Sequence, residues 1–365
     1  MRRTTIDRPF LVMVVTLVVL GFFIFTSASL GLLARDGASF SSVAFSQIFL
    51  GIVLGTIALL INTRIHYSFF RRYSLFIFLL SIATTLLVFV PDLGVEINGA
   101  RRWVDIGLVS FQPAEFLKIG FVIYFAAWLS RVRDKMHSFS YSVVPFVILL
   151  GFVGAILLAQ PDTGTFIVIV STGFVMFLVG GAKWRHVAAV VGLSVISAAT
   201  LALTRPYVME RVLAFLDPSK DPLGSSYQIQ QSLIAIGSGG LFGRGFGQSI
   251  QKFNFLPEPA SDSIFAVIGE EFGFVGAVIL ISLFLALALR GLKIASRAPD
   301  YFSGLLVVGI VILITSQSFI NIASMLGIFP LIGLPLLFVS HGGTAFLFVL
   351  FEVGIVLGIS RYMKR

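Results

Sequence analysis

The sequence contains no cysteine, and only 12% of its 365 residues are charged. The absence of cysteine excludes disulfide bonds and thiol chemistry. Histidine is also scarce, and the four histidines do not have the spacing of a zinc site. In contrast, 57% of the residues are hydrophobic, and the mean hydropathy is +1.01. A water-soluble domain of this size cannot bury so much apolar surface, so the chain must use lipid as its solvent.

The apolar residues occur in long runs that short connections separate. Runs of about 20 residues suit a hydrocarbon layer of about 30 Å, and they are much longer than the strands of a membrane barrel. The sequence therefore predicts an all-α polytopic membrane protein, with one membrane domain over residues 1–365 and no internal repeat. Ten transmembrane helices are expected, at about residues 10–33, 43–61, 73–91, 113–130, 142–159, 163–180, 187–203, 262–289, 302–327 and 341–360.

The distribution of basic residues predicts the orientation. Most of the 26 basic residues lie at the chain ends and in alternate connections, so both termini are expected to be cytoplasmic. The net charge of +9 then needs no nucleic acid to explain it, because anionic membrane lipids supply the counter-charge. Two long connections, at about residues 91–112 and 204–261, fall on the outer face. The second joins helices seven and eight, and its residues 225–240 are expected to form an amphipathic helix along the membrane surface.

Several basic residues lie on this outer face, where the orientation rule disfavours them. One hypothesis is that some of them bind an anionic group of a substrate, with phosphate as the favoured group. The alternative is that they are solvated loop residues in contact with lipid head groups. They are Arg35, Arg101, Arg102, Arg205, Arg211, Lys220, Arg244 and Lys252, with Lys118 just inside the fourth helix.

The connection that leads into the fourth helix combines these cations with an aromatic residue. Arg101 and Arg102 can bind a diphosphate, and Trp103 suits either a sugar face or the membrane interface. Glu115 and Lys118 are three residues apart, so they share one helix face and can form an ion pair. Charges inside a membrane are costly and usually functional, although a purely structural ion pair is the alternative.

Acidic residues gather where the eighth helix begins. Asp262 is either the N-cap of this helix or a general base at the membrane boundary, and the two roles are compatible. Glu270 lies about 12 Å deeper along the helix, so Glu270 and Glu271 are expected to pair with cations or polar backbone inside the bundle. Asp162 and Glu352 are isolated acids for which helix capping and packing are the simplest roles.

Residues 237–247 read GSGGLFGRGFG and resemble a glycine-rich phosphate cradle. They lack the Gly-Lys-Ser/Thr ending of such a cradle, and no strand is expected before them. A turn that lets the long connection fold back is the favoured interpretation.

Six motifs, which extend over nearly the whole chain, resemble the shape, elongation, division and sporulation (SEDS) family, the FtsW and RodA proteins. The stretches NGARRW and QKFNFLPE are more similar to the corresponding FtsW sequences than to those of RodA. Residues 260–261 and residue 341 depart from the common family pattern, which bears on the subtype and not on the family. The motifs are NGARRW (98–103), FQPAEFLK (111–118), QPDTGT (160–165), SYQIQQSLIAIGSGGLFGRGFG (226–247), FLPEPASDSIFAVIGEE (255–271) and LIGLPLLFVSHGGT (331–344).

The resemblance implies ten helices and a peptidoglycan glycosyltransferase that polymerises lipid II at the outer face of the bacterial cytoplasmic membrane, in cell division or elongation. The essential aspartate and tryptophan of the family match Asp262 and Trp103. Asp262 is expected to be the general base of an inverting reaction. The expected substrate-binding residues are Arg101, Arg102, Trp103, Glu115, Lys118, Arg211, Arg244 and Glu258.

The resemblance also implies a partner, a class B penicillin-binding protein with transpeptidase activity. No cofactor is evident; a divalent cation could assist departure of the diphosphate, but no motif fixes its site. Two other functions stay open, a lipid II flippase and a non-catalytic scaffold of the division or elongation machinery.

Overall fold

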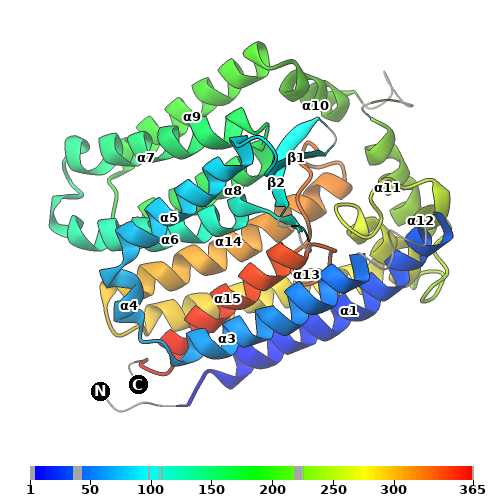
Figure 1. Ribbon diagram of the computed structural model, residues 1–365, viewed down its shortest axis with the longest axis horizontal. Helices are drawn as coiled ribbons and strands as arrows, with labels where there is room; N and C mark the ends of the chain where they lie inside the picture. The colour runs from blue at the N-terminus through cyan, green and yellow to red at the C-terminus, as the bar shows by residue number, and fades with distance from the viewer. Residues whose placement is uncertain are drawn as a thin grey trace.

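The computed structural model describes residues 5–35, 43–97, 99–105, 107, 110–217, 224 and 226–363. Long helices lie side by side in a bundle, with a small sheet and several of the short helices gathered at one end (Figure 1). Among the described residues, eight helices are long and apolar enough to cross a membrane, and two more are apolar but shorter. The prediction of a polytopic helical membrane protein is confirmed.

Each predicted apolar run contains a helix. The second run begins with α-helical residues 43–45, passes through the π-helix η1 (Ser46–Leu54) and continues as α3. The third run ends in the 3-10 turn η2 (Leu87–Phe89). The two shorter apolar helices, α5 with η2 and α8, occupy the third and sixth runs. The helices of the ten runs are α1 (Arg8–Arg35), η1 with α3 (Gly55–Arg64), α5 (Ser74–Leu86), α6 (Pro113–Arg131), α7 (Phe139–Ala159), α8 (Thr163–Val179), α9 (Trp184–Thr204), α13 (Ile264–Ser296), α14 (Tyr301–Met325) and α15 (Gly343–Ser360).

Burial separates central helices from peripheral ones. The most apolar windows of α14, α15 and α6 are 78%, 89% and 72% buried, whereas that of α9 is 11% buried. Apolar side chains on α9, such as Ile196 and Leu203, are exposed. A soluble protein would not expose so much apolar surface on a helix, so these peripheral faces are suited to contact with lipid.

The connection predicted as a loop at residues 91–112 contains a three-stranded antiparallel sheet, so the all-α prediction is wrong at this point. Its strands are β1 (Gly94–Ile97), β2 (Ala100–Asp105) and β3 (Ser110–Phe111), in the order β1-β2-β3. The short alternating segments around two arginines were too brief to indicate strands. The sheet ends at Phe111, and Pro113 occupies the first turn of α6.

The second long connection contains three helices, α10 (Pro206–Leu216), α11 (Tyr227–Ser238) and α12 (Gln251–Asn254). The expected helix within residues 225–240 is thus confirmed as α11, and it packs against α13. Figure 1 places these helices at the same end of the bundle as the sheet, whereas α1 begins and α15 ends at the opposite end. The remaining short elements are α4 (Tyr67–Arg72) and the 3-10 turn η3 (Arg133–Lys135).

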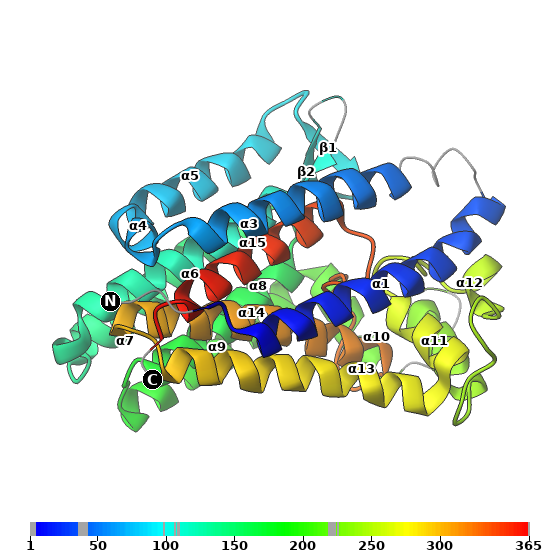
Figure 2. The same cartoon turned by 90° about the horizontal axis from the view of Figure 1, so that it is seen from below.

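Helix α13 is broken after its first nine residues. Gly273 has φ +65° and ψ −163°, which are not helical, so a short segment that begins at Ile264 is offset from the long remainder. Figure 2 shows α13 running alongside α1, and the two helices are in contact. The short segment carries Asp262 at its entrance, so the break helps to set the position of the candidate base.

Candidate active site

Asp262 lies in the turn that connects α12 to α13. Glu258 has φ +48°, and its carbonyl accepts the amides of Ser261 and Ser263 at 3.1 Å each. Because of this turn, α13 begins only at Ile264, with Ser263 as its N-cap residue and no side-chain cap hydrogen bond. The Asp262 carboxylate instead accepts a hydrogen bond from the Ser261 hydroxyl, 3.1 Å from Oδ1. The N-cap alternative for Asp262 is therefore wrong, and the carboxylate is available for chemistry.

The chain that follows α14, residues 326–342, packs against this turn; we call it the return segment. The Ser340 hydroxyl donates to the Ser261 carbonyl at 2.6 Å. Gly333 has φ +63°, and a Cβ added there would lie 3.4 Å from Oδ2 of Asp262. The backbone of the return segment therefore forms a wall directly beside the carboxylate.

Two guanidinium groups lie near this carboxylate, on different elements. Arg102 on β2 donates from Nε to the Gln160 carbonyl at 3.5 Å and from Nη2 to the Pro161 carbonyl. Arg211 on α10 donates from Nη1 to the Leu331 carbonyl at 3.1 Å. Backbone carbonyls hold both cations in place without neutralising them, so their positive charge remains available to an anionic ligand.

The environment of Asp262 changes its acidity. The pKa of this carboxyl is raised from 3.8 to about 6, chiefly by burial and then by the negative charge of Glu258. The hydrogen bond from Ser261 and the charges of Arg211 and Arg102 lower the pKa in opposition. A carboxylate with a pKa near 6 is ionised at neutral pH and is a stronger base than an ordinary aspartate, as general-base catalysis requires.

Asp162 belongs to the same charged group, although the sequence indicated only a helix cap. It caps α8, because its Oδ1 accepts the Thr165 amide at 3.2 Å. Its buried Oδ2 has no hydrogen-bond partner among the described residues. The net pKa of Arg211 is lowered, chiefly by burial and then by the charge of Arg102. Tyr207, Asp262 and Asp162 act on it in the opposite direction.

His341 in the return segment lies beside the turn, since its amide donates to the Ala260 carbonyl at 2.7 Å. Burial lowers the pKa of its imidazole from 6.5 to about 4. The ring is therefore neutral at physiological pH and cannot act as a cation toward a diphosphate.

The predicted pair of neighbouring arginines is split by the alternation of strand β2. Arg101 forms an exposed ion pair with Glu96, with 3.2 Å between Nε and Oε2, whereas Arg102 is bonded to the backbone of residues 160–161 and its charge acts on Asp262. Trp103 is half-buried in the same strand and pairs with Val95 of β1. Of the two arginines, only Arg102 therefore acts electrostatically on the candidate base.

The predicted pair of Glu115 and Lys118 forms inside α6. The atoms Oε2 and Nζ are 2.9 Å apart, and the side chains are 3% and 1% exposed. Lys118 also donates to Oε1 of Gln317 at 2.5 Å. Nε2 of the same Gln317 side chain donates to the Pro335 carbonyl at 3.2 Å. The ion pair is thus connected to the return segment through the Gln317 side chain.

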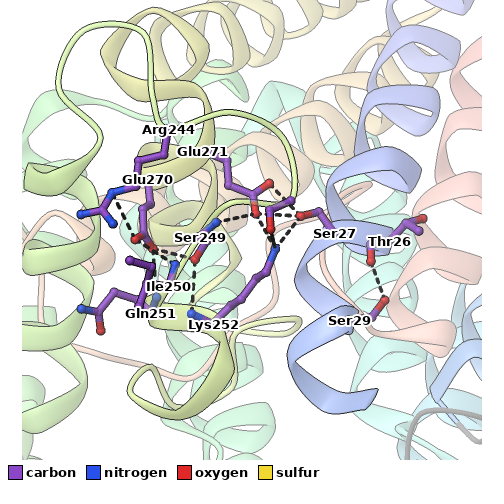
Figure 3. A network of polar contacts seen from close by, with 11 residues as sticks. Thr26, Ser27, Ser29, Arg244, Ser249, Ile250, Gln251, Lys252, Glu270 and Glu271 are labelled. Carbon is purple, nitrogen blue, oxygen red and sulfur yellow. Dashed lines mark hydrogen bonds and ion pairs between the residues drawn. The ribbon is translucent and has the colours of Figure 1, made fainter. Parts of the chain in front are cut away.

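Arg244 belongs to a second polar cluster, which Figure 3 shows. Its Nε lies 3.6 Å from Oε1 of Glu270. Lys252, which was expected among the outer-face cations, is fully buried and donates to Oε1 of Glu271 at 2.7 Å and to the Ser27 hydroxyl at 3.0 Å. The prediction that Glu270 and Glu271 pair with cations and polar backbone inside the bundle is confirmed.

The glycine-rich residues 237–247 close against the break in α13. The amides of Arg244 and Gly245 donate to the carbonyls of Glu270 and Glu271 at 3.0 Å each. A Cβ added at Gly243, which has φ +81°, would lie 2.1 Å from the Glu271 carbonyl oxygen, so this approach requires glycine. The turn interpretation of these residues is confirmed.

Three further cations were predicted on the outer face. Arg205 is exposed at the end of α9. Lys220 and the side chain of Arg35 lie outside the described residues.

Within the described part of the chain, no group of three or more metal-ligating side chains could hold an ion. A divalent cation that arrives with a diphosphate stays a prediction.

Comparison with known proteins assigns the chain. A family model for the FtsW, RodA and SpoVE proteins, described as cell cycle protein, matches residues 8–365. The chain belongs to the FtsW/RodA/SpoVE family. Stage V sporulation protein E of Bacillus subtilis is 39% identical over 313 residues, which is 85% of each chain. A protein of Trichlorobacter lovleyi named "Probable peptidoglycan glycosyltransferase FtsW" is 35% identical over 361 residues, 98% of this chain and 94% of its own.

Solved structures of FtsW/RodA/SpoVE proteins and their complexes share this fold. A chain in a structure described as "Structural coordination of polymerization and crosslinking by a peptidoglycan synthase complex" matches with a TM-score of 0.79 and 28% identity, over 98% of both chains. The rod shape determining protein RodA of Thermus thermophilus matches with a TM-score of 0.71 and 27% identity, over 99% of this chain and 98% of its own. The SEDS family resemblance is therefore confirmed, while the preference for FtsW over RodA stays a prediction.

The sequence did not indicate three polar residues on α14 that contact the return segment. Gln317, Asn321 and Ser324 are buried and occur at a spacing of four and then three residues. Polar side chains at this spacing in an apolar helix lie on one face, which is a signal for a polar partner. It was overlooked because no acid or base stands among them.

Proposed function

We propose that this chain is a peptidoglycan glycosyltransferase that polymerises lipid II into glycan strands at the outer face of the bacterial cytoplasmic membrane. The observation that carries the proposal is the Asp262 carboxylate, which caps no helix and lies beside Arg102 and Arg211. The names of the relatives support the activity, and a function in cell division or elongation is consistent with the family.

In the proposed reaction, a sugar hydroxyl of one chain attacks the anomeric carbon of another. Asp262 accepts the hydroxyl proton as the new C–O bond forms, because a neutral hydroxyl is a weak nucleophile. The bond between the anomeric carbon and the lipid diphosphate breaks, and the diphosphate leaves with the bonding pair. Arg102 and Arg211 stabilise its negative charge, so no separate acid is needed. A single displacement inverts the anomeric centre.

The proposed topology has ten transmembrane helices with both termini in the cytoplasm. It is supported by the eight long apolar helices and by the two shorter ones in the third and sixth runs. Helix α1 begins and α15 ends at the bundle end opposite the sheet and α10–α12 (Figure 1), so cytoplasmic termini would leave the turn between α12 and α13, which carries Asp262, on the outer side. We further propose a class B penicillin-binding transpeptidase as partner, which would cross-link the strands made here.

A liposome assay distinguishes this function from its rivals. Purified protein in liposomes without ATP, supplied with labelled lipid II, is expected to form glycan polymer, and a parallel sample with EDTA tests for the divalent cation. The buried charges of Glu115, Lys118 and Glu352 are features that a flippase also needs. Labelled lipid that crosses the bilayer without polymer would identify a flippase, and neither product would identify a scaffold.

The pH dependence of the polymerisation rate follows from the raised pKa of Asp262. The base acts only when ionised, so the rate is expected to fall as pH drops below about 6, approaching tenfold per unit. Because Glu258 raises the pKa, Glu258→Gln is expected to move this acid limb to lower pH. Initial rates measured from about pH 4.5 to 8 test both statements. A wild-type rate that is constant across this range would contradict them.

The same pKa has the opposite consequence for stability. The folded-state pKa lies above the ordinary value of 3.8, so the folded state binds this proton more tightly than the unfolded state. The contribution of Asp262 to stability is thus present at low pH and is lost as pH rises through about 6. Stability and activity therefore change in opposite directions over this range at this one residue.

A further inference from the structure

Helix α14 presents three buried polar side chains to the return segment. Nε2 of Gln317 donates to the Pro335 carbonyl at 3.2 Å, and the Ser324 hydroxyl donates to the Pro330 carbonyl at 3.0 Å. Between them lies Asn321, which is 2% exposed. The three side chains hold an irregular backbone, whose carbonyls need donors when they are buried, along one face of a helix.

Asn321 makes a contact that the other two do not share. Its Nδ2 donates to the Leu334 carbonyl at 2.6 Å and to the Asp262 carbonyl at 2.8 Å. Both amide hydrogens are thereby used, and they join the turn that carries Asp262 to the segment that contains Gly333. The geometry of the carboxylate relative to its wall therefore depends on one side chain.

The geometry points to Asn321 as a positioning residue for the glycosyl transfer, one that clips the Asp262 turn to the return segment so that the carboxylate is held in place for the sugar hydroxyl. This inference rests on the proposed function, in which Asp262 is the base. Asn321 acts through Asp262 and the backbone, without contact with the substrate.

The chemistry of the site requires an amide at position 321. Rotating the Asn321 amide by 180° would place Oδ1 against two carbonyl oxygens, so the donor orientation is the only one that suits this site. Leucine, which has a similar shape, would leave both carbonyls without a donor. Aspartate would set a carboxylate against the same two carbonyls. Either change is expected to release the turn from the return segment.

Contacts made only for folding would give a different pattern. Ser324→Ala removes a hydrogen bond from the same helix to the same segment, but at Pro330 rather than beside Asp262. Ser318→Ala removes a buried hydroxyl that donates only within α14, to the Ile314 carbonyl at 2.9 Å. If Asn321 served only the packing of the return segment, its replacement would resemble Ser324→Ala.

The experiment compares Asn321→Leu, Ser324→Ala and Ser318→Ala with the wild type, using purified full-length protein and lipid II. Asn321→Leu is expected to lower kcat by about 10- to 100-fold, because a displacement of about 1 Å is sufficient for such a loss, with KM changed by less than about threefold. The two serine variants are expected to keep kcat within about twofold. Thermal unfolding of each variant reports whether it is folded.

The acid limb of the kcat profile supplies a readout that packing alone would not move. The charged groups that face Asp262 are Glu258 in its own turn, Arg211 on α10 and Arg102 on β2, and all three remain in Asn321→Leu. Releasing the turn admits water to the carboxylate, so the limb is expected to move to lower pH. In Ser324→Ala the limb is expected to stay in place.

The inference is overturned if folded Asn321→Leu has the wild-type kcat, if its loss equals that of Ser324→Ala, or if its acid limb does not move. Should Asn321→Leu fail to accumulate, Asn321→Ser, whose hydroxyl can donate to only one of the two carbonyls, takes its place under the same criteria. Failure of the inference differs from failure of the proposed function. Wild-type protein that forms no polymer would overturn the proposed function, and an active Asp262→Asn variant would overturn Asp262 as the base, whereas an active Asn321→Leu beside an inactive Asp262→Asn would overturn only the inference.

Discussion

Replacing Asp262 by asparagine is expected to lower the rate of glycan polymerisation by about 10²- to 10⁴-fold, the usual contribution of a general base. Asparagine keeps the size of the side chain and can still accept the hydrogen bond from Ser261. It cannot accept the proton of the attacking hydroxyl, so the loss should lie in kcat. The measurement is the initial rate of polymer formation from purified lipid II, with products separated by chain length.

A matched control separates loss of the base from loss of a carboxylate elsewhere. Asp134, which is exposed in η3, is remote from the site in sequence, so Asp134→Asn should keep the wild-type rate. Thermal unfolding of Asp262→Asn should show a folded protein, because no helix cap is lost. A folded Asp262→Asn variant with more than about a tenth of the wild-type rate would exclude Asp262 as the base.

Replacing Lys252 by methionine is expected to lower the free energy of unfolding by about 3–5 kcal/mol, because it leaves Glu271 charged and buried without its cation. Lys252 is 0% and Glu271 is 1% exposed, and 2.7 Å separates Nζ from Oε1. The pair also joins α1 to α12 and α13 through Ser27 (Figure 3). Unfolding of the purified protein in mixed micelles, titrated with a denaturing detergent, measures the loss.

The double variant Lys252→Met with Glu271→Gln tests the cause. It removes both charges, so it should be more stable than Lys252→Met alone. Lys293→Met changes an exposed lysine of the same helix α13 and should alter stability by less than about 0.5 kcal/mol. A Lys252→Met variant as stable as the wild type, or a double variant less stable than the single one, would show that the pair is not what holds this region.

Much of the fold followed from hydropathy alone, since each predicted apolar run contains a helix. The sheet at residues 94–111 did not, because short strands around charged residues have no clear period. The break of α13 at Gly273 was also invisible, because the residues on both sides favour a helix. The glycine-rich turn stabilises this break by supplying amides to two helix carbonyls, which is a tertiary contact.

The site shows the same division at the level of single residues. The sequence indicated Asp262 as a base, because it is an acid at the membrane boundary. Arg102 and Arg211 were among the residues predicted to bind an anion. The sequence could not separate Arg102 from Arg101, because that choice depends on which face of β2 is directed at the turn. It could not separate Arg244 from Arg211 either, since the pairing of Arg244 with Glu270 requires the fold.

Composition and motif order by themselves determined that the chain is a helical membrane protein, that it belongs to its family and that Asp262 is its candidate base. These features are local, since apolar runs and motifs are read along the chain. Only the tertiary structure decided which cations face Asp262, that Lys252 is buried with Glu271, and that Asn321 joins the two segments beside the carboxylate. Those pairings join residues tens to hundreds of positions apart, and their energies depend on burial, which exists only after the helices have packed.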